Sequence, residues 1–126
     1  MGVITIFINK LLAGETPMVF GDGKQIRDFV SVYDIAAGVT AALECDGLSG
    51  VFNLGSGEPR SVNDIAELLR QKIAPAVEIA HAEPRPGEIN NSVADISAAR
   101  QALGYDPKGN LDELADEVID AIRAAR

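Results

Sequence analysis

The sequence predicts an α/β fold, α+β-like in its layout, in which short strands are interspersed with about five helices. Apolar residues recur at helical spacing in several segments, and shorter segments alternate between apolar and polar residues. Turn-forming Gly, Pro and Asp residues separate these segments. Because 47% of the 126 residues are apolar, the chain can build one core, and we expect residues 1–126 to form a single domain.

An apolar stripe at helical spacing opens the chain and predicts a helix that ends near Gly14. The stripe comprises Ile4, Phe7, Ile8, Leu11 and Leu12. Its β-branched residues are also compatible with a strand. Val3 and Ile6 make a second face apolar, so a helix here requires two packing partners.

A strand, a turn, a second strand and a helix start are expected between residues 17 and 43. Residues 17–20 form a short predicted strand, and Gly-Asp-Gly at 21–23 predicts a chain reversal because glycine tolerates positive φ. From Gln25 onward apolar and polar residues alternate, which predicts a half-buried strand that carries Arg27. Asp34 precedes an apolar segment, and we expect its carboxylate to cap a helix over 35–43.

Strand and helix signals continue in the middle of the chain. Residues 51–54 are expected to form a short buried strand. Ser61 opens a predicted helix with a capping box, in which Asp64 replaces the preferred Glu. Pro75 ends this helix, and the alternation at 77–80 predicts another strand.

The last third of the chain predicts two helices. Asp95 is the expected cap of a helix over 96–103, and Gly104 suits the left-handed position that follows a helix. Residues 111–122 carry an apolar stripe, with acidic residues on the remaining face.

Composition excludes several classes of function. The net charge of −8 and the lack of a Lys/Arg run disfavour nucleic acid as a partner. A small anionic ligand remains compatible, because a few arginines in a cleft can reverse the local field. Cys45 is the single cysteine and no Cys/His cluster has metal-ligand spacing, which fits a reducing cytoplasm. We expect neither a membrane span nor a signal peptide in this sequence.

Two arginines on restrained backbone are the candidate ligand-binding residues. Arg27 allows two interpretations: an ion pair with Asp28 or another nearby carboxylate, or a bidentate contact to a phosphate. Arg85 lies between Pro84 and Pro86, which restrict the backbone and reduce the entropy lost when the side chain is ordered. An arginine in a loop can equally be solvated.

Other candidate residues have a structural and a functional interpretation. Phe20 by itself is typical of a core aromatic. Asn53 either ties the following loop together or faces a ligand. The Gly-Ser-Gly sequence at 55–57 permits a phosphate cradle of backbone amides, but its spacing favours a strand-to-helix turn. His81, the only histidine, has no evident nucleophile or metal partner, and we expect it at the surface.

Several motifs resemble, in the same order, those of the extended short-chain dehydrogenases/reductases, the nucleotide-sugar epimerases and dehydratases that include UDP-glucose 4-epimerase. Residues 21–34 are similar to the family's GDG-x-Q-x-RDF-x-x-V-x-D motif, and residues 52–58 to its N-x-G-x-G turn. Residues 85–88 (Arg-Pro-Gly-Glu) resemble its RPGD motif, and residues 94–107 its ADIS-x-A and LG-x-x-P tail. The opening helix resembles one in the family, which implies that its second face meets a part outside this sequence.

This resemblance implies a ligand and a role for each candidate residue. It implies that the chain binds a nucleotide sugar, with a UDP-sugar favoured, and that Arg27 and Arg85 both bind the diphosphate. Phe20 is then expected against the base, and Asn53 near the sugar nucleotide. Glu88 stands where the family has an Asp that binds ribose hydroxyls, so this position departs from the pattern by one methylene.

The catalytic and cofactor motifs of that family do not occur in this sequence. Tyr33 and Tyr105 are not followed four residues later by Lys, and no Gly-x-x-Gly-x-x-Gly turn is present. The resemblance therefore implies the carboxyl-terminal, substrate-binding part of an enzyme, with no catalytic residue here and with NAD or NADP bound by a Rossmann domain elsewhere. The alternative is a non-catalytic nucleotide-binding or assembly module that self-associates through its apolar opening helix.

Overall fold

The computed structural model describes residues 2–126 and contains five α-helices and five short strands in that range. The helices are α1 (Val3–Leu12), α2 (Val32–Glu44), α3 (Val62–Ile73), α4 (Ser97–Leu103) and α5 (Leu111–Ala124). The strands are β1 (Met18–Phe20), β2 (Ile26–Asp28), β3 (Pro59–Ser61), β4 (Ala80–Ala82) and β5 (Asn91–Ser92). The predicted class of short strands with about five helices is confirmed. Met1, included in the domain predicted over 1–126, lies outside the described residues.

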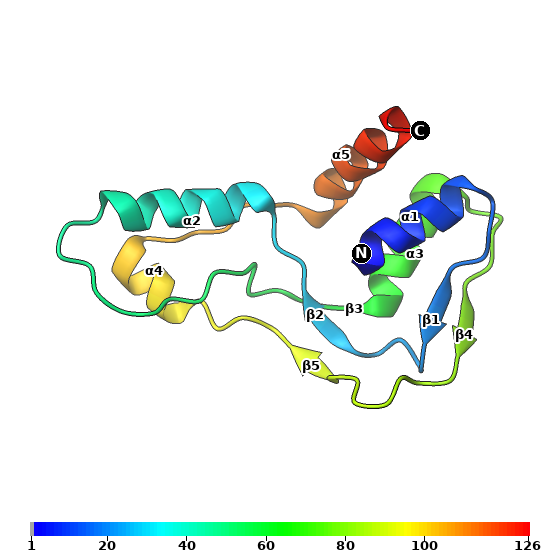
Figure 1. Cartoon of the computed structure of the whole chain (residues 1–126), viewed down its shortest axis with the longest axis horizontal. Coiled ribbons are helices and arrows are strands. Elements are labelled where there is room, and N and C mark those ends of the chain that lie inside the picture. Colours follow the sequence, from blue (N-terminus) through cyan, green and yellow to red (C-terminus); the bar gives the residue numbers. More distant parts are fainter. Residues whose placement is uncertain (1) are drawn as a thin grey trace.

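The strands form two small sheets (Figure 1). In the first, β1 pairs in parallel with β4. In the second, β2 lies in the centre, antiparallel to β3 and parallel to β5. Arg27 in β2 is directly opposite Arg60 of β3 and Ser92 of β5. Distant parts of the sequence therefore meet at the strand that carries the first candidate residue.

The main hydrophobic core lies between α1, α3, α5 and β1, at one end of the molecule (Figure 1). Its buried residues are Phe7, Ile8, Leu11, Val19, Val62, Ile65, Ala66, Leu69, Ala115 and Ile119. Apart from Val19 of β1, they lie in α1, α3 and α5, where apolar residues at helical spacing cover one helix face. The opening helix is confirmed, and it packs against both α3 and α5.

A second, smaller cluster lies under α2 and α4 at the opposite end (Figure 1). Ile96, Ala99 and Tyr105 are its buried members, and Phe52 and Leu54 pack against them. A Cβ atom added to Gly38 of α2 would lie 2.7 Å from the Leu54 side chain, so this approach requires glycine.

Several predicted helix ends are confirmed. Ser61 and Asp64 form the reciprocal capping box, with hydrogen bonds of 3.1 Å and 2.8 Å between each side chain and the other's backbone amide. Gly104 follows α4 in the left-handed conformation with φ of 63°. The cap predicted at Asp95 is wrong: Ile96 is the cap residue of α4, and Asp95, one residue earlier, accepts a hydrogen bond from the Ser97 amide at 3.0 Å.

The predicted cap of α2 is wrong. Ser31 occupies the cap position, where its hydroxyl accepts a hydrogen bond from the Tyr33 amide at 3.1 Å. Asp34 lies inside the first turn, buried, and accepts hydrogen bonds from the Lys108 and Gly109 amides, each at 2.9 Å. Its carboxylate therefore holds the segment before α5, a contact that a local pattern does not encode.

Two strand predictions also require correction. Residues 51–54 are not a strand in the structure, and Val51 is 94% exposed, because no other described segment pairs with this one. The strand predicted over 77–80 is found at 80–82, where pairing with β1 sets its position. Of the helices in residues 2–126, none combines the length and apolar character needed to cross a bilayer.

Candidate functional site

The turn before β2 has the predicted conformation and fixes the start of the candidate site. Gly21 and Gly23 have φ values of 75° and 73°, in the region that favours glycine. A Cβ atom on Gly23 would lie 1.8 Å from the Asn63 side chain. The Asn63 amide nitrogen donates to the carbonyl of Asp22 at 2.8 Å, so α3 holds the turn in place.

Arg27 is engaged by the segment that follows Arg85 in the sequence. Its guanidinium donates to Glu88 Oε1 at 2.5 Å and to the Ile89 carbonyl at 2.6 Å. It also donates to the carbonyl of Ile26 at 2.8 Å. The structure thus shows an ion pair of Arg27, but the partner is Glu88 and not Asp28. The Arg27 and Glu88 side chains are 27% and 31% exposed, so a ligand can reach the pair.

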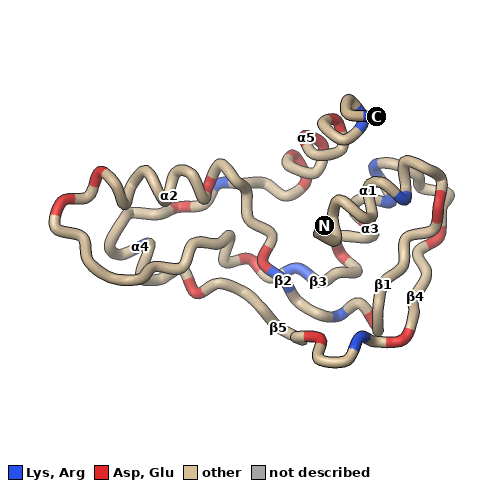
Figure 2. The backbone as a smooth tube through the Cα atoms, viewed as in Figure 1, with Lys and Arg blue, Asp and Glu red and all other residues tan. Residues whose placement is uncertain are grey.

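Arg85 stacks on Phe20. The guanidinium carbon lies 3.9 Å from the centroid of the Phe20 ring, a cation–π geometry. Pairing of β1 with β4 brings the two together, because Phe20 is opposite Ala82. The Glu88 amide donates to the Arg85 carbonyl at 3.2 Å, so Arg85 and Glu88 belong to one turn. Figure 2 shows basic positions in β2, β3 and the connection between β4 and β5, with acidic positions beside them.

Four of the five predicted site residues line two neighbouring cavities of about 420 Å³ each, whereas Arg85 lines neither. Phe20 and Glu88 line the first, together with Gln25. Arg27 and Asn53 line the second. Since the Arg27–Glu88 ion pair joins a residue of one cavity to a residue of the other, the two cavities meet at this pair. Phe20, Arg27, Arg85 and Glu88 are thus linked by direct contacts.

The glycine loop at 55–57 is not an open phosphate cradle. The amides of Ser56 and Gly57 donate to the carboxylate of Asp28 at 2.8 Å and 3.0 Å. The strand-to-helix interpretation is also wrong, because residues 51–54 before this loop are not a strand and strand β3 follows it. His81 is exposed as predicted, and its Nδ1 lies 2.9 Å from the Gly21 carbonyl oxygen.

Asp28 is a residue of this region that sequence reasoning considered only as a partner of Arg27. Burial alone raises the pKa of its carboxyl, but hydrogen bonds from Ser56, Gly57 and Ala94 outweigh burial and hold the pKa below its usual value. The carboxylate is therefore ionised at neutral pH. The only local feature of the sequence that pointed to Asp28 was its position next to Arg27, because the residues that it binds lie far away in the sequence.

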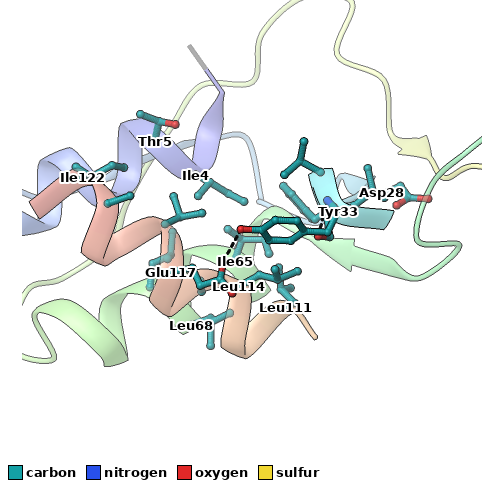
Figure 3. Close-up of a pocket in the computed structure, with 18 residues that line it drawn as sticks. Ile4, Thr5, Asp28, Tyr33, Ile65, Leu68, Leu111, Leu114, Glu117 and Ile122 are labelled. Carbon is teal, nitrogen blue, oxygen red and sulfur yellow. Dashed lines mark hydrogen bonds between the residues drawn. The ribbon is translucent and has the colours of Figure 1, made fainter. Parts of the chain in front are cut away.

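A larger cavity of about 690 Å³ lies between α1, α3, α5 and the start of α2 (Figure 3), and it shares Asp28 and Val30 with the cavity that contains Arg27. Its lining is mostly apolar and includes the carboxylates of Asp28 and Glu117 but no Lys or Arg. Tyr33 reaches across it, and its hydroxyl donates to Glu117 at 3.4 Å (Figure 3). Volume alone would favour this cavity as the ligand site. Its lining, however, carries carboxylates and no basic residue, which does not suit an anionic ligand.

Comparison with known proteins defines the family. The family profile of GDP-mannose 4,6 dehydratase matches residues 1–118. The chain belongs to this family, and the resemblance to the nucleotide-sugar epimerases and dehydratases is confirmed.

Individual relatives agree with this assignment. The chain is 37% identical over 119 residues to a putative UDP-glucose 4-epimerase of Methanocaldococcus jannaschii, covering 94% of this chain and 38% of the relative. UDP-glucose 4-epimerase of Thermotoga maritima, solved with UDP-glucose, superposes with a TM-score of 0.91 at 34% identity, over 98% of this chain and 40% of that one.

A third protein is UDP-glucuronic acid 4-epimerase of Bacillus cereus, solved with UDP-glucuronic acid and NAD. It superposes with a TM-score of 0.91 at 30% identity, over 99% of this chain and 40% of that one. The chain thus spans about 40% of the length of the relatives that it matches.

Proposed function

We propose that the chain is the substrate-binding domain of an NAD-dependent nucleotide-sugar epimerase or dehydratase and holds the ligand by its diphosphate. Arg27 and Arg85 bind the phosphates, Phe20 lies on the base side, Glu88 on the ribose side and Asn53 on the sugar side. The observation that supports this best is the chain of contacts from Phe20 through Arg85 and Glu88 to Arg27, between two cavities. The solved relatives from Thermotoga maritima and Bacillus cereus are complexes with UDP-glucose and UDP-glucuronic acid.

The ion pair between Arg27 and Glu88 gives this site a specific binding step. A carboxylate on a guanidinium occupies the donors that a phosphate would use. The diphosphate therefore displaces Glu88 from Arg27, and the freed carboxylate becomes available to the ribose hydroxyls. Both groups lie on short, hydrogen-bonded segments, so this exchange needs only side-chain rotation.

The cofactor of the parent enzyme belongs outside this chain. NAD supplies hydride transfer in relatives of this kind. We expect no dinucleotide site at the glycine-rich loop 55–57, because the amides of Ser56 and Gly57 are bound to Asp28. We therefore assign to this chain the binding of the substrate and no catalytic step.

The outer face of α2 is the surface on which we place the cofactor-binding domain. Val39 and Leu43 are 50% and 83% exposed, and Val32 and Tyr33 are exposed as well. Val32 and Tyr33 also line the apolar cavity of Figure 3, so cavity and helix face form one continuous surface. An apolar surface of this extent is typical of an interface. The relatives have more than half of their length left to cover it.

Binding of UDP-glucose measured by isothermal titration calorimetry tests the proposal. Arg27→Ala and Arg85→Ala should each weaken binding about 10- to 100-fold, the effect of losing charge-assisted hydrogen bonds. Arg60→Ala is the matched control: it removes the same charge directly opposite Arg27, but Arg60 pairs with Glu58 and takes no part in the contacts that link Phe20, Arg85, Glu88 and Arg27. Equal affinities for all four proteins would contradict the phosphate contact.

A further inference from the structure

The Asp28 carboxylate, at the end of β2, accepts hydrogen bonds from two loops that are far apart in the sequence. Its Oδ1 accepts hydrogen bonds from the Ser56 amide at 2.8 Å and the Ser56 hydroxyl at 2.5 Å. Its Oδ2 accepts from the Gly57 amide at 3.0 Å and the Ala94 amide at 3.2 Å. A carboxylate accepts at two oxygens, so these donors fill both of them with protein partners.

The two loops held by Asp28 are opposite walls of the cavity that contains Arg27. One wall is formed by residues 53–55 and the other by residues 92–95. A Cβ atom on Gly55 would lie 2.5 Å from the Ala94 Cβ and 2.6 Å from Asp28 Oδ2. The walls thus approach as closely as glycine allows, and the spacing depends on the carboxylate between them.

Asp34 provides a comparison within the same chain. It is a carboxylate as well, more deeply buried than Asp28, and it accepts hydrogen bonds from two backbone amides, those of Lys108 and Gly109. The segment that it holds lies before α5 and lines neither of the two cavities. Both acids anchor a loop, but only Asp28 anchors loops that form the candidate site.

We propose that Asp28 is a positioning residue of the substrate site. Its ionised carboxylate sets the distance between the two walls and so directs Asn53 toward the sugar side of a bound nucleotide sugar. Asp28 acts through these walls, because its own oxygens are occupied. The proposal rests on the proposed function, and it adds a specific consequence: loss of Asp28 affects the sugar side of the ligand and leaves the nucleoside side, at Phe20, intact.

Two ligands separate this role from a general effect on stability. UDP-glucose occupies both cavities in the proposed mode, whereas UMP lacks the glucose and the second phosphate and occupies mainly the Phe20 side. Asp28→Asn should weaken binding of UDP-glucose about tenfold or more and change binding of UMP less than about threefold. Asp34→Asn should lower the melting temperature but leave both affinities unchanged. Each titration is run on protein shown by circular dichroism to be folded.

Gly55→Ala gives a second route if Asp28→Asn does not fold. The added methyl group separates the walls while the carboxylate stays, and the same selective loss of UDP-glucose binding is expected. An equal loss for UDP-glucose and UMP, or no loss for either, would overturn the positioning role. If the unmodified chain binds neither ligand, the proposed function itself fails, which is a different result from unchanged selectivity in a chain that does bind.

Discussion

The two ends of the molecule are stabilised in different ways. The helical core, made of α1, α3, α5 and β1, buries ten apolar residues in one continuous cluster among the described residues. The α2–α4 region, made of α2, α4 and the segments 52–57 and 94–109, buries three, Ile96, Ala99 and Tyr105. Burial of apolar area is the main favourable term in folding, so the helical core carries most of the stability.

In the α2–α4 region, hydrogen bonds from side chains to backbone groups compensate for the smaller apolar cluster. Asp28 and Asp34 each hold a distant segment through its amides, and the buried Tyr105 hydroxyl donates to the Gly55 carbonyl at 2.8 Å. The candidate site lies where the two regions meet. A binding site at such a border depends on directional hydrogen bonds, because apolar packing alone does not fix the position of a loop to the accuracy that ligand binding requires.

The largest effect is expected in the helical core. Leu69→Ala should lower the free energy of unfolding by about 2–5 kcal/mol, because it removes a side chain that is 1% exposed and leaves a cavity. Leu103→Ala, the same change at a half-buried position of α4, should cost clearly less. Urea denaturation followed by circular dichroism measures both. Equal losses would show that the two regions are packed alike.

The next effect concerns the polar contacts of the α2–α4 region. Tyr105→Phe should cost about 1–3 kcal/mol, because it leaves the Gly55 carbonyl without its buried donor. Burial, with the nearby charges of Asp34 and Asp28, raises the pKa of the Tyr105 hydroxyl, so it remains a donor at neutral pH.

Tyr33→Phe is the matched control for Tyr105→Phe. It also deletes one hydroxyl, but Tyr33 is 65% exposed and its contact with Glu117 is 3.4 Å long. We expect a change within about 0.5 kcal/mol. Similar unfolding energies for the two variants would contradict a structural role of the Tyr105 hydrogen bond.

A smaller effect is expected at the border between the regions. Glu88→Gln should strengthen binding of inorganic pyrophosphate by up to about fivefold, because a partly exposed ion pair on Arg27 contributes at most about 1 kcal/mol. Pyrophosphate has no ribose, so it isolates the competition at Arg27. Calorimetry with Glu83→Gln is the control, since Glu83 lies in the same connection and makes no ion pair among residues 2–126. Weaker binding by Glu88→Gln would contradict the displacement step.

The smallest effect is expected on the outer face of α2. Leu43→Gln should leave the melting temperature almost unchanged, with an effect on stability within about 0.5 kcal/mol, because this side chain is 83% exposed. Light scattering should show less self-association, since the variant interrupts the apolar surface. A marked loss of stability would mean that α2 is packed as the helices of the core are.

Patterns within a few residues predicted much of the fold. The capping box at Ser61, the left-handed Gly104 and the apolar stripe of α1 each depend on neighbours within about one helical turn. The strand expected at 51–54 failed for the opposite reason, because a strand exists only through a partner segment. Asp34 failed as a cap because Ser31, three residues earlier, satisfies the first turn.

Patterns in the amino-acid sequence were enough to predict the helices, their apolar faces, the glycine turn before β2 and, through its motifs, the family of the chain. Tertiary structure decided the ion pair of Arg27 with Glu88, 61 residues away, the stacking of Arg85 on Phe20 and the anchoring of two loops by Asp28. Local patterns could not predict these contacts, because the residues that form them are far apart in the sequence. A helix signal acts over one or two turns, whereas the partner of a charged side chain depends on strand pairing and on which loops the packed core brings together.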